Sequence, residues 1–172
     1  MHSKKKTMRM MTLSALLAAM TCVMTMFVKI PIPVGGYVHL GDAFVLLCGW
    51  LLGPIYGACS AGIGSMLADL FSGYPQYAIF TLIIKALMAM TVYACGQTLC
   101  KKQQDLSFFG KITGGILAEL IMALGYFACD WMFYGSAAFV NLALYLLKGG
   151  GNLAVAMALM TVMERTGLRK RI

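Results

Sequence analysis

Charged residues are scarce in this sequence of 172 amino acids, of which they make up 12%. Six residues are acidic, four are proline and two are histidine, whereas hydrophobic residues account for 60%. Because soluble globular domains carry about 25% charged residues, this composition excludes a water-soluble globule. The chain is therefore predicted to be an integral membrane protein without a soluble domain.

The scarcity of histidine excludes several kinds of chemistry. His2 lies in a basic tail and His39 in a predicted loop, so no helix carries a base for an intramembrane protease at Ser65.

A phosphate-binding loop is absent from the sequence, because Lys148 precedes the glycines at 149–151 instead of following them. The six cysteines occur singly, and no group of residues has metal-ligand spacing. We expect no enzymatic activity, metal or cofactor.

Six apolar stretches dominate the sequence. A helix of about 20 residues crosses a hydrocarbon layer of about 30 Å, and prolines and glycines mark the breaks between the stretches. The pattern predicts an all-α integral membrane protein, a single domain formed by a bundle of six transmembrane helices. The predicted spans are residues 8–28, 43–52, 55–71, 77–99, 112–129 and 139–163.

The net charge of +8 comes from three short basic clusters between the apolar stretches. A nucleic-acid surface would place basic residues along one solvated face, so no nucleic-acid partner is expected. Basic clusters flank membrane helices on the cytoplasmic side, which predicts that both termini are cytoplasmic. The clusters are Lys4, Lys5, Lys6 and Arg9, then Lys101, Lys102 and Lys111, then Arg165, Arg169, Lys170 and Arg171.

The first predicted helix has rows of small residues. Ala15 and Ala19 are four residues apart, as are Ser14, Ala18 and Cys22. This spacing lets another helix approach closely within a membrane. The neighbour is either a helix of the same chain or a helix of a second membrane subunit.

Two polar turns are predicted to border one pocket. The first contains Tyr37 and His39, and the second follows Asp69. Asp42 is expected to cap the helix that begins beside it. Lys85 lies about two turns inside the fourth span, where a buried charge needs a partner. That partner is expected to be Asp69 or a polar group of a substrate.

The last two predicted spans also carry polar groups inside the membrane. Glu119 and Tyr126 occur in the fifth span. Spacing of three and four residues places a polar row on one inward face of the sixth span. The members of this row are Asn141, Tyr145, Lys148 and Asn152. Lys148 is expected to contact a substrate or to pair with Glu119, and the glycines at 149–151 permit close helix approach or a break.

Five short motifs are distinctive in combination, at residues 36–43, 51–54, 64–70, 72–74 and 81–85. Together they resemble the substrate-binding S components of energy-coupling factor (ECF) vitamin transporters, in particular the riboflavin-type branch. The resemblance extends over essentially the whole chain. It implies six helices and a vitamin pocket near the outer face, capped by the first loop.

The resemblance also implies partners and site residues. Energy would come from a transmembrane coupling subunit, to which Ala15 and Ala19 would dock, and from two ATPase subunits, in a prokaryotic inner membrane. The family's pocket positions carry over to this sequence as Tyr37, His39, Lys85, Glu119, Tyr126, Asn141, Tyr145, Lys148 and Asn152.

The identity of the vitamin stays open, because similar folds serve different ligands. Two lysines and several aromatic residues suit pyridoxine, a hydroxymethylpyrimidine, riboflavin or pantothenate. The alternatives are a self-sufficient secondary transporter of a polar solute and a membrane-embedded enzyme. A carrier would typically show internal repeats and paired broken helices, which the sequence lacks. The expected function is therefore capture of a water-soluble vitamin at the outer face for an ECF-type importer.

Overall fold

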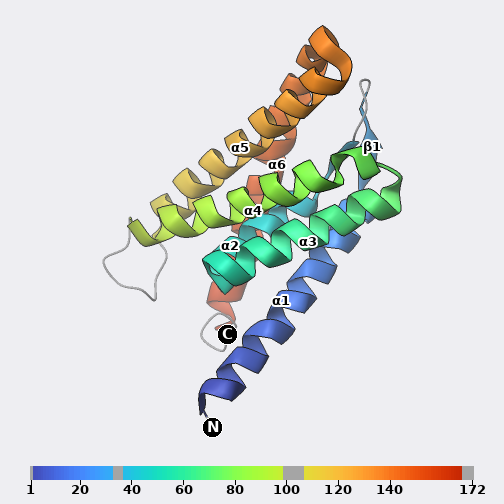
Figure 1. The fold of residues 1–172 in the computed structure, drawn as a ribbon. Coiled ribbons are helices and arrows are strands. Elements are labelled where there is room, and N and C mark those ends of the chain that lie inside the picture. The colour runs from blue at the N-terminus through green and yellow to red at the C-terminus, as the bar shows by residue number, and fades with distance from the viewer. Residues whose placement is uncertain (1, 33–36, 99–106, 168–172) are drawn as a thin grey trace.

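Six α-helices and one short hairpin form the described part of the chain (Figure 1), residues 2–32, 37–98 and 107–167 of a computed structural model. The expected all-α fold is confirmed. The helices are α1 (His2–Phe27), α2 (Gly41–Leu52), α3 (Pro54–Ser72), α4 (Pro75–Thr98), α5 (Phe108–Tyr134) and α6 (Ala138–Arg165), and the short 3-10 helix η1 (Gly135–Ala137) joins α5 to α6.

The helix boundaries differ from the predicted spans mainly at α1 and α5. α1 begins at His2 rather than at residue 8, because the lysines and methionines of the basic segment are good helix formers. α5 continues to Tyr134, five residues beyond the predicted end. α6 runs through the glycines at 149–151 as one continuous helix, so the local break permitted by those glycines does not occur.

Membrane character is supported by three stretches that are long and apolar enough to cross a bilayer: Thr7–Phe27, Pro75–Gln97 and Phe108–Arg165. The last of these contains both α5 and α6. α2 is apolar but has 12 residues, about 18 Å at the helical rise. Six complete crossings therefore stay a prediction.

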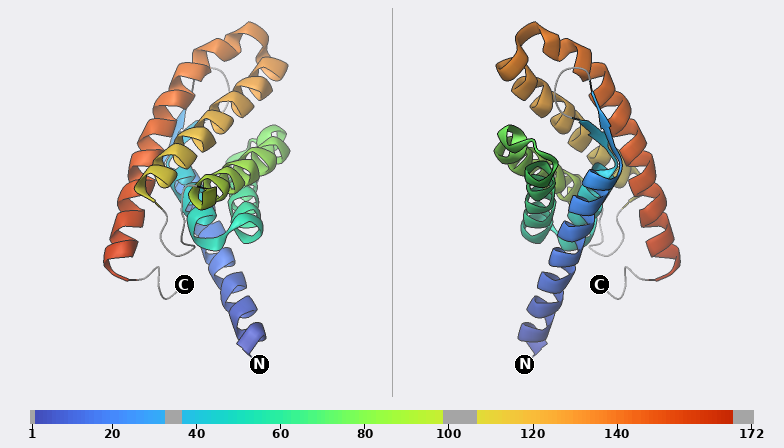
Figure 2. Two further views of the ribbon diagram at one scale, coloured as in Figure 1. Left: turned by 90° about the vertical axis from the view of Figure 1, so that its left-hand side faces the viewer. Right: turned by 90° about the vertical axis from the view of Figure 1, so that its right-hand side faces the viewer.

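α2 lies at the centre of the bundle. Eleven of its 12 residues are buried, as expected for a helix that is apolar on all sides. It packs against α1, α3, α4 and α6. α3 packs against α4, α4 against α5 and α5 against α6, and the two side views show the α3–α4 pair and the α5–α6 pair diverging from each other (Figure 2). Polar groups on α2 therefore face the interior from its first turn onward.

Small residues bring these helices close together. A Cβ atom added at Gly57 of α3 would lie 2.7 Å from the Cys48 carbonyl oxygen of α2. Gly64 of α3 lies directly against the Ala18 backbone of α1. The row containing Ala18 therefore packs inside this chain, whereas Ala15 and Ala19 are exposed.

A two-stranded antiparallel hairpin folds over one end of the bundle. β1 (Lys29–Pro31) pairs with β2 (Tyr37–His39), and Ile30 lies opposite Val38. The side chains of Tyr37 and His39, both on β2, are buried. The start of α1 and the end of α6 lie at the opposite end of the molecule (Figure 1). We refer to the two ends as the hairpin end and the terminal end.

Those residues of the basic clusters that the structure describes lie at the terminal end. Lys111 near the start of α5 pairs with Glu164 near the end of α6 at 2.9 Å. This contact ties the two helices together and neutralises one of the predicted flanking charges. Five members of the clusters lie outside the described residues: Lys101, Lys102, Arg169, Lys170 and Arg171.

Candidate functional site

A cavity opens beneath the hairpin and encloses about 330 Å³ including its mouth. Much of that space is open to the outside, and the enclosed interior is only about 20 Å³, so the cavity is small. Side chains from β2 and four helices form its wall. The lining residues are Tyr37, His39, Asp69, Tyr77, Tyr126, Tyr145 and Lys148.

Tyrosine rings make up most of this wall. The ring of Tyr126 on α5 lies 6.4 Å from that of Tyr77 on α4 and 5.7 Å from that of Tyr145 on α6, between ring centroids. Tyr37 closes the hairpin side and lies 5.1 Å from Tyr74. These separations are those of interacting aromatic pairs. The cavity wall therefore offers aromatic faces to a ligand.

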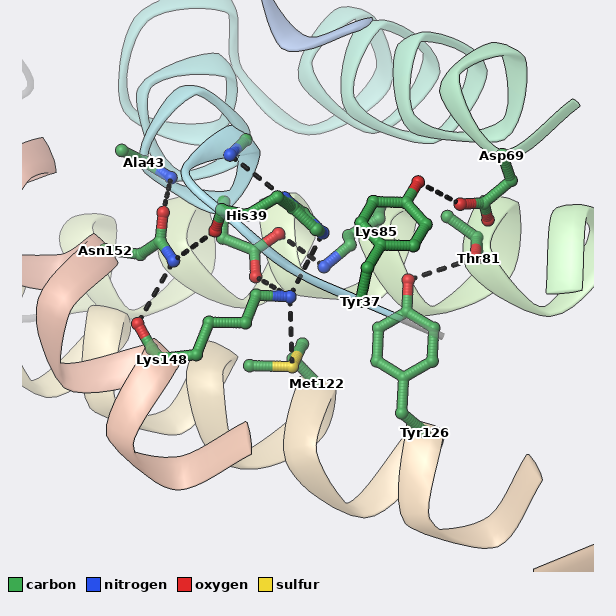
Figure 3. Close-up of polar contacts among 12 residues, drawn as sticks. Tyr37, His39, Ala43, Asp69, Thr81, Lys85, Met122, Tyr126, Lys148 and Asn152 are labelled. Atoms are coloured by element: carbon green, nitrogen blue, oxygen red, sulfur yellow. Dashed lines mark hydrogen bonds and ion pairs between the residues drawn. The ribbon is translucent and has the colours of Figure 1, made fainter. Parts of the chain in front are cut away.

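Two lysines meet one carboxylate below the cavity, an arrangement that we call the Asp42 cluster. Asp42 is fully buried at the start of α2; its Oδ1 atom lies 2.5 Å from Lys85 Nζ and its Oδ2 atom 2.9 Å from Lys148 Nζ. Figure 3 shows the two lysine side chains converging from α4 and α6. Such a buried network is favourable only when each charge has its partner.

The Asp42 cluster overturns three expectations. Lys85 pairs with Asp42, so the predicted pairing of Lys85 with Asp69 is wrong, and so is that of Lys148 with Glu119. Asp42 does not cap α2, because the helix already includes Gly41, and its first-turn N–H groups at Gly41 and Ala43 are bonded by other side chains. The carboxylate lies within that turn and points to the lysines instead.

His39 and Asn152 fasten the hairpin to the helices (Figure 3). His39 Nδ1 accepts a hydrogen bond from the Gly41 backbone N–H at 3.0 Å, and its Nε2 atom lies 3.1 Å from Lys148 Nζ. The Asn152 amide donates to the His39 carbonyl at 3.0 Å and accepts from the Ala43 N–H at 3.1 Å. Burial and the neighbouring Lys148 charge hold the pKa of His39 well below its ordinary value. The imidazole is therefore neutral at pH 7.

A second buried carboxylate, Asp130, is held by neutral donors. It accepts hydrogen bonds from Tyr77 Oη at 2.6 Å, Asn141 Nδ2 at 2.8 Å and Tyr145 Oη at 2.7 Å. We call these four residues the Asp130 cluster. Because Tyr77 and Tyr145 also line the cavity, Asp130 fixes the orientation of two of its aromatic walls.

Two further carboxyl groups are only partly satisfied. Asp69 Oδ1 accepts a hydrogen bond from Tyr37 Oη at 2.7 Å, whereas Oδ2 has no hydrogen-bond partner in the described part of the chain. Neither carboxyl oxygen of Glu119 has a hydrogen-bond partner among the described residues. A buried acceptor without a donor is unusual. Asp69 lines the cavity, so a ligand donor can reach it.

Comparison with known proteins identifies the family. The family of ECF-type riboflavin transporter S components matches residues 5–165. The chain belongs to this family of S components. It is therefore the substrate-binding subunit of a vitamin transporter and works with an ECF module; S components are not themselves enzymes.

Individual relatives agree with this assignment. The S component is 29% identical over 166 residues to the "Thiamine precursor transporter HmpT" of Lactococcus lactis subsp. cremoris (strain MG1363), covering 95% of this chain and 92% of the relative. It is 38% identical over 117 residues to an uncharacterised protein of Pyrococcus woesei, covering 66% of this chain and 72% of that protein.

A solved structure shows the same fold. It is described as the S component of a bacterial ECF transporter and superposes with a TM-score of 0.72 at 22% sequence identity. The match covers 92% of this chain and 96% of that chain. The arrangement of helices around the hairpin is therefore the S-component arrangement.

Five of the nine predicted pocket residues of this S component line the cavity: Tyr37, His39, Tyr126, Tyr145 and Lys148. The other four are buried around it. Lys85 holds Asp42, Asn141 holds Asp130, Asn152 holds the hairpin, and Glu119 has no bonded partner among the described residues.

Sequence reasoning missed Tyr77 and Asp130 and treated Asp69 chiefly as a partner for Lys85. A signal for Tyr77 was present, because Tyr77, Thr81 and Lys85 follow four-residue spacing along one face of α4. Asp130 follows Tyr126 at the same spacing on α5. Each of these two spacings would have indicated a polar helix face directed into the pocket.

Proposed function

We propose that this S component captures a thiamine precursor of the pyrimidine class in the cavity beneath the hairpin. The observation that carries the proposal is the small aromatic cavity, whose walls are tyrosine rings from β2, α4, α5 and α6. A single flat ring can stack on such a wall, each good aromatic contact contributing about 0.5–1.5 kcal/mol. The name of the relative HmpT supports the same ligand class.

Riboflavin is the second candidate, because the matching family is named for it. A flavin has three fused rings and a polyhydroxylated chain, so the small size of the cavity favours the single-ring ligand. Native mass spectrometry of the protein purified without added ligand tests both candidates. We expect a bound mass equal to that of 4-amino-5-hydroxymethyl-2-methylpyrimidine, and a flavin mass would overturn the proposal.

We propose further that the hairpin end faces outward and that both termini are cytoplasmic, with six crossings of a prokaryotic inner membrane. The start of α1 and the end of α6 both lie at the end of the molecule opposite the hairpin, which supports this orientation (Figure 1). Cysteines introduced on a cysteine-free background at Ser136 and Thr166 provide a matched pair. An impermeant reagent added to whole cells should modify position 136 and spare 166, and the reverse pattern would contradict the orientation.

We also propose that Ala15 and Ala19 dock to a transmembrane coupling subunit, which two ATPase subunits drive. Both alanines are exposed on α1, whereas Ala18 faces Gly64, and this difference supports an external role for their face. Ala19→Trp should abolish uptake by the assembled transporter and leave ligand binding to the isolated protein intact. Ile79→Trp places the same bulk on an exposed position of α4. Equal loss of uptake in both variants would defeat the docking role.

A further inference from the structure

Buried acidic groups outnumber buried lysines around the cavity. Four carboxyl groups lie there, on Asp42, Asp69, Glu119 and Asp130, and two ammonium groups, on Lys85 and Lys148. The third buried lysine, Lys111, is bonded to Glu164 at the terminal end. Since both cavity-side lysines are bound to Asp42, the remaining carboxyl groups have no bonded cation within the described residues.

Of these carboxyl groups, Asp69 lines the cavity and can contact a ligand directly. Its side chain is 5% exposed and comes from α3 into the cavity wall, where Tyr37 Oη occupies only Oδ1. Oδ2 has no hydrogen-bond partner in the described ranges. Tyr37 and Asp69 point toward each other, and Thr81 lies beside the carboxylate (Figure 3). Thr81 Oγ1 lies 3.0 Å from Tyr126 Oη, where either hydroxyl can be the donor, and Thr81 also interacts with the Asp69 carboxylate.

The aromatic wall reinforces the preference for positive charge. The face of an aromatic ring carries negative electrostatic potential and attracts a cation within about 6 Å. Lys148 Nζ already lies 5.7 Å from the Tyr126 centroid, and Lys85 Nζ lies 5.0 Å from it. The Tyr77 and Tyr145 hydroxyls donate to Asp130, so their oxygens carry more negative charge than those of free phenols.

The opposite wall supplies donors. His39 uses Nδ1 to accept from the Gly41 N–H, so the neutral ring carries its proton on Nε2. Nε2 lies 3.1 Å from Lys148 Nζ, which is also a donor, so neither group satisfies the other and a ligand acceptor is needed on this side of the cavity. An oxygen on the ligand can accept from this side while the ligand's N–H groups reach Asp69. The two walls therefore orient a ring that has donors on one edge and an acceptor on another.

We propose that the cavity binds its heterocycle as the protonated cation, with ligand N–H groups donating to Asp69 and a ligand oxygen accepting from the His39 and Lys148 side. The proposal deepens, and rests on, the proposed function in pyrimidine capture. Protonation places the positive charge of the ring between Asp69 and the tyrosine faces. The groups that face this charge are Tyr37 and His39 from β2, Tyr77 from α4, Asp69 from α3, Tyr126 from α5, and Tyr145 and Lys148 from α6, with Asp42, Lys85, Glu119 and Asp130 behind them.

A matched pair of ligands tests the proposal on the unmodified full chain in detergent. One is 4-amino-5-hydroxymethyl-2-methylpyrimidine, and the other is its 4-oxo analogue, which stays neutral over the same pH range. Titration calorimetry is run at pH values from one unit below to two units above the pKa of the aminopyrimidine ring. We expect affinity for the aminopyrimidine to fall about tenfold per pH unit above that pKa, and affinity for the analogue to be weak and independent of pH.

A variant separates a cationic ligand from a neutral ligand that meets a protonated Asp69. Asp69→Asn keeps the shape and offers a neutral amide, so it should lose at least tenfold in affinity for the aminopyrimidine and show a flattened pH profile. Tyr37→Phe is the control, because it removes the hydroxyl donor and keeps the carboxylate; its pH profile should keep the original slope. Melting temperatures confirm that both variants are folded.

The outcomes are distinct. A pH-independent affinity for the aminopyrimidine, equal binding of the two ligands, or an Asp69→Asn variant that binds as tightly as the original overturns the cation proposal while leaving pyrimidine capture in place. If neither ligand binds at any pH, the proposed function fails and the cation proposal with it. The ligand comparison needs no variant, so it stands even where Asp69→Asn does not fold.

Discussion

Asp42 and Asp130 are both fully buried near the hairpin end, but the protein holds them in opposite ways. Asp42 receives two ammonium groups from α4 and α6, whereas Asp130 receives three neutral donors from the same two helices. The first arrangement neutralises charge at the centre of the bundle. The second leaves charge in place and uses it to position the walls of the cavity. One fold thus separates a structural carboxylate from one that shapes a binding site.

The largest effect is expected from Asp42→Asn, which removes the negative charge that binds Lys85 and Lys148. The substitution leaves two buried lysines without their carboxylate, and removing one partner of a buried ion pair costs about 3–5 kcal/mol. We expect a large fall in melting temperature in detergent and loss of ligand binding. The double variant Asp42→Asn with Lys85→Met should recover part of the stability, since one stranded charge is removed. A melting temperature near that of the original protein in the single variant would contradict the network.

Lys148→Met tests whether the same cluster also contacts the ligand. Lys85 still neutralises Asp42 in this variant, so stability should change little. Ligand affinity should fall about tenfold to a hundredfold, as expected for a lost charged hydrogen bond of about 1.5–3 kcal/mol. Glu119→Gln is the companion variant, and because no hydrogen bond joins Glu119 to Lys148 in the described structure, the two stability effects should add. Strong coupling between them, with affinity unchanged, would make Lys148 purely structural.

Asp130→Asn should be milder than Asp42→Asn, because it strands no opposite charge. The amide retains one acceptor for the three donors, and an unsatisfied buried group costs about 1–3 kcal/mol. We expect a moderate fall in melting temperature together with weaker ligand binding, since Tyr77 and Tyr145 lose their fixed orientation. Tyr145→Phe, which removes one donor, should cost about 1 kcal/mol. Equal destabilisation by Asp130→Asn and Asp42→Asn would erase the distinction between the clusters.

The smallest effect concerns pH and His39, which lies in β2 outside the helices. Its pKa is lowered in the folded protein by burial and by Lys148, so below about pH 6.5 the unfolded chain binds a proton that the folded chain does not. Stability should therefore fall as the pH drops below this value, by about 1.4 kcal/mol per unit at most. Melting curves at pH 7.5 and 5.5 should show a smaller difference for His39→Gln than for the original protein. An unchanged difference would exclude His39 as the cause.

The helices could be predicted from the sequence because local features mark their ends. Gly53 and Pro54 separate α2 from α3, and Gly73 ends α3 in a left-handed conformation that favours glycine. Polar spacing on α6 correctly predicted an inward face. These signals depend on residues close together in the chain, so no knowledge of packing was needed.

The partners of the buried charges could not be predicted in the same way. Whether Lys85 meets Asp42 or Asp69 depends on how α2 and α3 are placed around α4, and the sequence does not contain that placement. The predicted fifth span ends at residue 129, one residue before Asp130. In the structure α5 continues to Tyr134, which puts Asp130 a full turn inside the bundle.

The hairpin has a mechanical consequence for the first helix. Only Val28 separates the end of α1 from the start of β1, so the hairpin is joined to the helix by a single residue. Lys29 lies at this junction, 5.4 Å from the Tyr37 ring centroid and 5.8 Å from that of Tyr74. A ligand that shifted β2 on entering would therefore also turn α1, on which Ala15 lies about 18 Å from the hairpin.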